Sequence, residues 1–152
     1  MAGFNDDEIE DFVALTAEYP LEVRFIELMP MGQADPGAYL PGDTVLARCP
    51  ALVPAEPSGV ARRWRLPGGK GLVGLIEPMS HRFCGSCDRI RITADGRLKP
   101  CLHSAQEIPL RGLRGEDLRR AVRAGIAAKP ARHYMAEEGR SQTVRNMNEI
   151  GG

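Results

Sequence analysis

The spacing of apolar positions in the first thirty residues predicts a helix followed by a strand. Residues 5–18 carry four apolar side chains at helical spacing: Ile9, Phe12, Val13 and Ala17. Asn5 and Glu8 fit an N-terminal cap with its capping box. The run 21–29 is rich in Val, Phe and Ile and predicts a largely buried strand. A helix, a short turn and a buried strand are typical of an α/β protein with parallel strands.

The middle of the chain predicts less regular structure. Residues 30–60 are rich in Pro, Gly and Ala and show little periodicity, apart from one helical turn at 43–47. Strands at 60–66 and 72–76 flank a Gly-rich turn, which predicts a β-hairpin. Farther along, 115–129 predicts a helix that ends before a proline. Its apolar stripe consists of Leu118, Val122 and Ile126.

A second hairpin is predicted at 89–102, with a three-residue loop that ends in a left-handed glycine, Gly96. In this register Arg89 faces Cys101. Because side chains alternate along a strand, Cys87, Arg91, Arg89 and Cys101 are expected on one side of the hairpin. A two-residue loop would place Cys101 on the opposite face.

Three of the four cysteines have the spacing of a metal site. Cys84 and Cys87 are separated by two residues, and Cys101 follows after thirteen more. The chain shows no secretory segment and no long apolar run, which predicts a cytoplasmic location without membrane insertion. Clustered cysteines in that compartment indicate metal ligands rather than disulfides. Cys49 stands apart, and we interpret it as a small buried hydrophobic residue.

Three thiolates are one ligand short of a closed four-cysteine site. His81 or His103 would complete a structural zinc site, whereas a three-cysteine iron–sulfur cluster would keep one iron open for a substrate atom. The spacing alone leaves both metals open. Arg89 and Arg91 on the same face favour an anionic substrate, because arginine forks suit phosphate groups.

Composition adds a charge pattern to this picture. The 152 residues carry 20 basic and 20 acidic side chains, so net charge argues neither for nor against nucleic acid. Residues 1–30 are acidic and residues 60–102 are basic. A basic stretch beside a metal site suggests an anionic ligand, although a solvated surface is the commoner explanation of such arginines.

The residues around the cysteines closely resemble the C-terminal cluster segment of the GTP 3′,8-cyclase family, radical S-adenosylmethionine enzymes of molybdenum cofactor biosynthesis. The matching stretches cover the chain in order: 83–93, 96–102, 5–9, 24–29 and the final Ile-Gly-Gly. One position departs from the pattern, because Asp88 stands where the family commonly has asparagine.

The resemblance implies a set of site residues. Cys84, Cys87 and Cys101 would hold a [4Fe-4S] cluster whose open iron binds the guanine of GTP. Three further sites follow from the family's motifs: GTP contacts at Arg89, Ile90 and Arg91, an S-adenosylmethionine contact at Met29, and a catalytic tail at Gly151 and Gly152. The implied fold is α/β. Residues 1–32 would be the last helix–strand unit of an incomplete parallel (βα) barrel, and residues 33–152 an α+β region with antiparallel hairpins around the cluster.

The resemblance also implies a reaction. In the complete enzyme, a 5′-deoxyadenosyl radical cyclises GTP to 3′,8-cyclo-7,8-dihydro-GTP. The family's N-terminal half carries three more cysteines for a second [4Fe-4S] cluster, which cleaves S-adenosylmethionine, and these 152 residues hold no such motif. We therefore expect this chain alone to be inactive.

The expected partners are GTP, a chain that carries the N-terminal half, and the downstream pyranopterin-forming enzyme. A homodimer is a further candidate assembly. Neither nucleic acid nor a membrane is an expected partner. Two alternatives of other classes are a structural zinc-binding module and a ferredoxin-like electron carrier, which metal analysis would separate from the cyclase.

Overall fold

The computed structural model describes residues 1–150, apart from the side chain of residue 148, and its contacts divide the chain into two compact units. Unit 1 comprises Met1–Leu28 and Asp35–Phe83. Unit 2 comprises Met29–Ala34 and the chain from Cys84 onward. No helix of the described residues is both long and apolar enough to cross a membrane.

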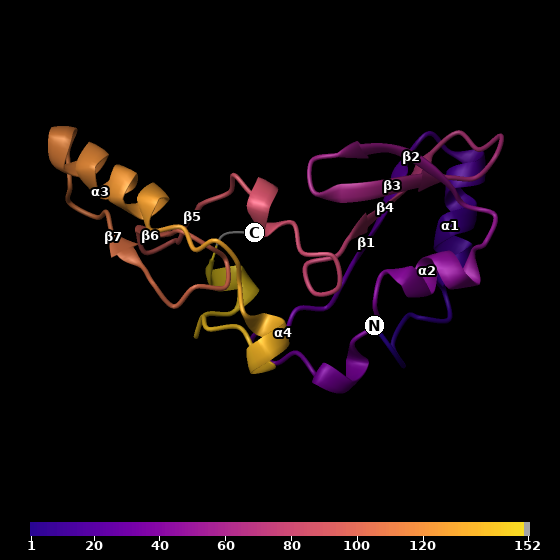
Figure 1. The fold of residues 1–152 in the computed structure, drawn as a ribbon, viewed down its shortest axis with the longest axis horizontal. Coiled ribbons are helices and arrows are strands. Elements are labelled where there is room, and N and C mark those ends of the chain that lie inside the picture. The colour runs from indigo at the N-terminus through magenta and orange to yellow at the C-terminus, as the bar shows by residue number, and fades with distance from the viewer. Residues whose placement is uncertain (151–152) are drawn as a thin grey trace. The chain divides into compact units, whose positions relative to one another are not determined.

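Unit 1 is built on a four-stranded sheet (Figure 1). Its strands lie in the order β1 (Glu22–Ile26), β4 (Leu72–Ile76), β3 (Ala61–Arg65) and β2 (Val53–Ser58). β1 pairs with β4 in parallel, and the other neighbours are antiparallel. The parallel pairing and the β3–β4 hairpin confirm the predictions. β2 was missed because Pro54 and Pro57 interrupt it, and an edge strand tolerates prolines that a central strand does not.

Two helices supply the core of unit 1, α1 (Ile9–Glu18) and α2 (Asp43–Arg48). The helical turn predicted at 43–47 is confirmed by α2. The buried core residues come from both helices, the end of α2 and the central strand β4: Ile9, Val13, Val45, Cys49, Val73 and Leu75. Cys49 is therefore the buried hydrophobic residue that its isolation predicted.

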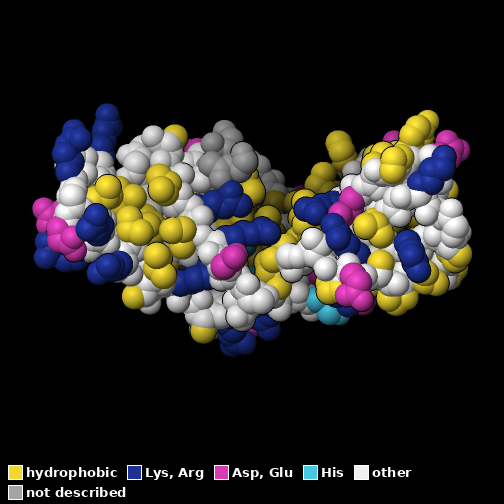
Figure 2. All heavy atoms as spheres, turned by 90° about the horizontal axis from the view of Figure 1, so that it is seen from above, with side chains coloured by type: hydrophobic (Ala, Val, Ile, Leu, Met, Phe, Trp, Pro, Cys, Tyr) yellow, Lys and Arg dark blue, Asp and Glu magenta, His cyan; other side chains and the backbone are white. Residues whose placement is uncertain are grey.

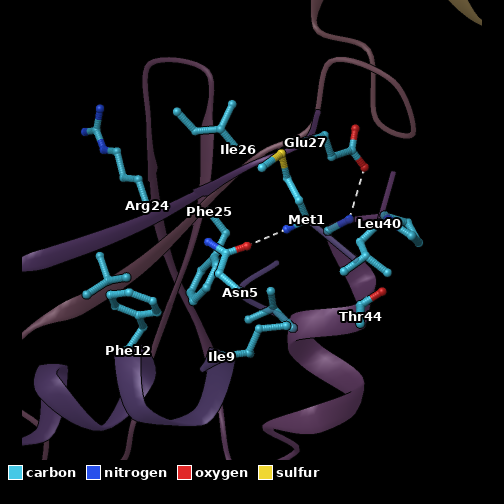
Figure 3. Close-up of a pocket in the computed structure, with 14 residues that line it drawn as sticks. Met1, Asn5, Ile9, Phe12, Arg24, Phe25, Ile26, Glu27, Leu40 and Thr44 are labelled. Atoms are coloured by element: carbon cyan, nitrogen blue, oxygen red, sulfur yellow. Dashed lines mark hydrogen bonds between the residues drawn. The ribbon is translucent and has the colours of Figure 1, made fainter. Parts of the chain in front are cut away.

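The start of α1 differs from the prediction. The helix begins at Ile9, and the Asn5 amide oxygen accepts from the Met1 amino group at 2.7 Å instead of capping the helix (Figure 3). Thr16 takes the third buried position, because its hydroxyl donates to the Val13 carbonyl and so satisfies its own polar atom. Phe12 and Ala17 of the predicted stripe are exposed, and Phe12 meets Phe25 edge to face.

The prediction of a largely buried strand at 21–29 was wrong. β1 alternates between half-buried and exposed residues, and Ile26 is 60% exposed. The reason is its place at the edge of the sheet in the described chain, where β4 covers one side only.

Glu27, directly after β1, is buried and joins two loops to the strand. Its side chain is 5% exposed and accepts backbone N–H bonds from Gly42 at 3.0 Å, Met79 at 2.8 Å and Ser80 at 3.0 Å. The hydroxyls of Tyr39 and Ser80 also donate to it. Burial alone would raise the pKa of Glu27, but these hydrogen bonds together lower it below its usual value. Figure 3 shows the carboxylate with its bond to the loop at Gly42.

Unit 2 contains the predicted cysteine hairpin. β5 (Arg91–Ile92), β6 (Arg97–Lys99) and β7 (Ile108–Pro109) form an antiparallel sheet in that order (Figure 1). Arg91 pairs with Lys99 and Ile92 with Leu98, which confirms the register of the three-residue loop. Gly96 has the expected positive φ of 78°. The strands are shorter than predicted, and β7 was missed because it has only two residues.

Helix α3 (Gly115–Ala127) packs against β6 and β7, and two of the three residues of the predicted stripe, Leu118 and Val122, are half-buried. Ile126 is 53% exposed, and the buried residue of the helix is Gly125. A Cβ at Gly125 would lie 2.3 Å from Leu98 Cδ2. This closest contact was not predicted because it uses a residue without a side chain, which a pattern of apolar residues does not reveal.

The C-terminal segment is fixed onto this sheet by buried charge. Lys99 is fully buried, and its amine donates to the Ser104 carbonyl at 2.6 Å and the Thr143 hydroxyl at 3.1 Å. Arg145 binds both oxygens of Glu107, at 2.6 and 2.8 Å, and Asp95 at 2.9 Å. Two further helical segments belong to this region, α4 (Met135–Glu138) and the 3₁₀ turn Met147–Glu149.

Candidate metal-cluster site

The paired cysteines lie on one tight turn of unit 2. Cys84 begins a 3₁₀ helix, Cys84–Ser86, and the Cys87 N–H donates to the Cys84 carbonyl at 3.2 Å. The turn forms here because glycine and serine separate the two cysteines and neither favours a longer helix. Both thiols, like that of Cys101, are free and half-buried. One turn therefore carries two potential ligand sulfurs.

The third cysteine returns on the other arm of the hairpin. Cys101 follows β6, and a turn in which the Ser104 N–H donates to the Cys101 carbonyl at 3.2 Å leads the chain away. The ladder ends at the pair Arg91–Lys99. Cys87, Arg89 and Cys101 lie beyond the last pair of the ladder. That their side chains share one side of the hairpin stays a prediction, which extends the observed register.

The positions of the sulfurs do not choose between the two kinds of metal site. A tetrahedral zinc ion with bonds of about 2.3 Å needs its sulfurs about 3.8 Å apart. Within residues 1–150, the sulfurs of Cys84, Cys87 and Cys101 do not all lie within 4.8 Å of one another. Three free, half-buried thiols fit the donor set of a three-cysteine iron–sulfur cluster, and a zinc ion with a fourth ligand uses the same donors.

The two histidines considered as a fourth ligand both contact other side chains. His103 is buried, its Nδ1 lies 3.2 Å from the Ser141 hydroxyl, and its ring meets His133 edge to face. Burial, with His133 and Lys99 nearby, lowers the pKa of His103 to about 4. His81 belongs to unit 1, where its Nδ1 lies 3.3 Å from Glu77.

The residues implied in substrate and cofactor binding lie at the following places. In unit 2, Arg89 is exposed and Ile90 and Arg91 are half-buried. Met29 is half-buried, and its carbonyl accepts from the Met31 N–H in the segment 29–34, which belongs to unit 2. Gly151 and Gly152 lie outside the described residues.

Ion pairs hold at least four of the nine basic side chains in the stretch 60–102. Four of its members pair with carboxylates of their own unit: Arg62, Arg63, Arg97 and Lys99. Figure 2 shows Lys and Arg side chains in separate groups on the face in view, with Asp and Glu among them. Arg89 and Arg91, the arginines nearest Cys87 in the sequence, stay the candidates for an anionic ligand.

A second group of potential ligands lies in unit 1. Single ligand atoms of Asp43, Glu77 and His81 lie within 4.8 Å of one another. The Arg62 guanidinium already occupies this group, with Nη2 3.3 Å from Asp43 and Nε 2.7 Å from Glu77. Burial raises the pKa of Glu77, although Arg62 and His81 act in the opposite direction. The arrangement is an ion-pair network in which arginine supplies the positive charge that a metal would bring.

Sequence reasoning missed one residue at the cysteine site. Lys129, just beyond α3, places its amino group 3.6 Å from the Cys87 sulfur. The pattern that could have revealed it is a lysine directly before the proline that stops a helix, where a cation suits the end of the helix dipole.

Known proteins place these features in a family. The family described as Molybdenum Cofactor Synthesis C matches residues 21–135. The chain belongs to this family. The matched range contains all three site cysteines, both sheets and helix α3.

Several curated relatives are similar to the whole chain. A GTP 3′,8-cyclase of Alkaliphilus metalliredigens is 46% identical over 160 aligned positions, which cover 100% of this chain and 50% of that protein. The cyclase of Alkaliphilus oremlandii is 44% identical with the same coverage. That of Moorella thermoacetica is 45% identical over 99% of this chain and 50% of its own length. The chain therefore spans about half the length of these relatives.

Proposed function

We propose that this chain is the GTP- and cluster-binding C-terminal part of a GTP 3′,8-cyclase. Membership of the molybdenum cofactor synthesis family and the names of the relatives support the reaction. The single observation that carries the site is the hairpin register, Arg91 opposite Lys99 and Ile92 opposite Leu98. This register brings Cys101 back toward the turn that holds Cys84 and Cys87.

In this proposal the three cysteines hold a [4Fe-4S] cluster. When bound, a cluster with three protein ligands would offer one open iron to the guanine of GTP. Cys84, Cys87 and Cys101 are free and half-buried, so their sulfurs are available as ligands.

The chain's other residues bind and orient the substrates. Arg89 and Arg91 offer guanidinium forks to the phosphates of GTP, and Ile90 between them offers an apolar contact. Met29, on the segment after β1, contacts S-adenosylmethionine. Gly151 and Gly152 form the tail that completes the active site.

We further propose that residues 1–32 are the end of an incomplete parallel barrel and that residues 33–152 form the region that binds cluster and GTP. The position of α1 before β1 supports this assignment, and β1 also pairs in parallel with β4 of the second region. β1 pairs on one side only among the described residues, and Ile26 is 60% exposed. A cavity of about 300 Å³ lies beside it, lined by Phe12, Phe25 and Leu40 among others (Figure 3). A preceding barrel strand would cover this edge.

Generation of the radical falls to a segment outside these 152 residues, since they contain no second group of three cysteines. The chain by itself is therefore inactive in this proposal, and it works with the part that carries that group, in the cytoplasm, before the pyranopterin-forming enzyme. Incubation of the purified chain with dithionite and S-adenosylmethionine tests this point. Release of 5′-deoxyadenosine by the chain alone would contradict it.

Metal analysis tests the site itself. After anaerobic reconstitution with iron and sulfide, we expect about four irons and four acid-labile sulfides per chain. Cys84→Ala, Cys87→Ala and Cys101→Ala should each lose most of this iron, whereas Cys49→Ala, in the core of unit 1, should keep it. Titration with GTP should change the EPR spectrum of the reduced cluster. One zinc per chain, or iron that does not depend on Cys101, would overturn the proposal.

A further inference from the structure

Three acceptors from two arms of the cysteine hairpin converge on one amino group. Lys129 Nζ donates to the Cys87 sulfur at 3.6 Å and to the Arg89 carbonyl at 2.7 Å, both on the first arm. It also donates to the Pro100 carbonyl at 3.2 Å, beside Cys101 on the second arm. An ammonium group has three donors, so these contacts use all of them.

The fold places this amino group by packing a helix against the hairpin. Lys129 lies two residues past the end of α3, and its own N–H still bonds to the Ile126 carbonyl at 3.2 Å. Gly125, one turn earlier, lets the helix approach Leu98 of β6 without a side chain between them. The Lys129 side chain therefore starts from a backbone that the sheet itself holds, and it needs no flexible loop to reach the cysteines.

We propose that Lys129 is a positioning residue for the cluster: it joins the Cys87 arm to the Cys101 arm and sets its positive charge against the Cys87 sulfur. The inference rests on the proposed function, because the cluster is what makes that sulfur a ligand. A cation and a hydrogen bond at a ligand sulfur raise the reduction potential, because the reduced cluster carries one more negative charge. Joining the two arms also keeps the ligands in place before the cluster is inserted.

The chain offers matched controls, since it contains three lysines. Lys129→Met removes the charge and the donors but keeps the length of the side chain. Lys129→Arg keeps the charge with different donor geometry. Lys70→Met alters an exposed lysine of unit 1 and serves as the control. Each variant is reconstituted anaerobically and compared with the wild-type chain in iron retained after gel filtration and in the midpoint potential of the cluster followed by EPR.

We expect Lys129→Met to retain the cluster about 10-fold less tightly, in line with the loss of an outer-shell partner, and to show a more negative midpoint potential. Lys129→Arg should recover most of the potential, because the charge returns, and Lys70→Met should match the wild type. An unchanged potential in Lys129→Met would overturn the proposal, even if that variant bound less iron, because a purely structural lysine would not act on the potential.

A measurement without metal separates this inference from the proposed function. Hydrogen exchange of the iron-free chain should rise in Lys129→Met in peptides from both arms, 84–91 and 97–104, and not in Lys70→Met. If the wild-type chain loads no cluster, the proposed function fails, and the role of Lys129 at a cluster fails with it. If the cluster forms but exchange rises in neither arm, the proposed function stands and the joining role of Lys129 is refuted.

Discussion

Replacing Glu27 by glutamine should strongly destabilise unit 1, although the change adds no bulk. The carboxylate accepts five hydrogen bonds within that unit, three from backbone N–H groups and two from hydroxyls. One oxygen serves Met79 and Ser80 N–H groups, and the other serves Gly42, Tyr39 and the Ser80 hydroxyl. Glutamine keeps one acceptor oxygen, so its nitrogen must face either two backbone N–H groups or the Gly42 N–H beside two hydroxyls that can turn to accept.

The cost follows from the N–H groups that lose their acceptor and from the loss of the charge that strengthens the remaining bonds. A hydrogen bond to a charged group contributes about 1.5 to 3 kcal/mol, and a buried donor without an acceptor adds to the penalty. We expect Glu27→Gln to lower the free energy of unfolding of unit 1 by about 3 kcal/mol, after some relaxation of the loops. Glu56→Gln, at an exposed position of β2 in the same unit, should change it by less than about 0.5 kcal/mol.

The assay uses the single tryptophan of the chain. Trp64 packs against the core of unit 1, so its fluorescence during urea denaturation reports on the unit that contains Glu27. Because the folded pKa of Glu27 is lowered, its contribution is complete above the ordinary carboxyl range and is lost as pH falls toward that lowered pKa. The difference between wild type and Glu27→Gln should therefore shrink as pH falls below the ordinary glutamate pKa of about 4.3 and through the lower folded pKa. A difference below about 1 kcal/mol at pH 7 would refute the reasoning.

The other predictions for the fold concern unit 2. Gly125→Leu should destabilise unit 2 by about 3 kcal/mol and detach α3 from β6, because even a Cβ would lie 2.3 Å from Leu98. Ala124→Leu, on the exposed side of the helix, should leave the stability unchanged. Circular dichroism during denaturation compares the two variants. Lys99→Met should release the segment around Thr143, since the buried amine is its donor there, and hydrogen exchange of peptides 141–147 should rise. In Lys99→Met, Glu107 keeps Arg145 as its partner. We therefore expect the free energy of unfolding of unit 2 to fall by about 2 kcal/mol, without complete unfolding. Unchanged exchange at 141–147 would show that Lys99 does not hold the segment.

Local patterns predicted much of the candidate site. The loop Ala94-Asp95-Gly96 determined the register of the cysteine hairpin, because a glycine with positive φ at its end selects the three-residue loop. Extended along the hairpin, that register predicts Cys101 on the same side as Cys87, although thirteen residues separate them. The same reasoning could not predict the contacts of Lys129 with both arms, since they depend on how closely α3 packs on β6.

Local stereochemistry and residue type in the sequence determined the alternation of helix and strand, the two hairpins and the buried character of Cys49. The three cysteines predict a metal site without choosing the metal, because their spacing along the chain is compatible with zinc and with a cluster. Tertiary structure decided how deeply each element is buried. Gly125 lets α3 approach its sheet closely, and β1 is half-exposed because it lies at an edge. Packing of α3 on the sheet also decided the contact of Lys129 with Cys87, because residues 42 positions apart meet only in the folded chain.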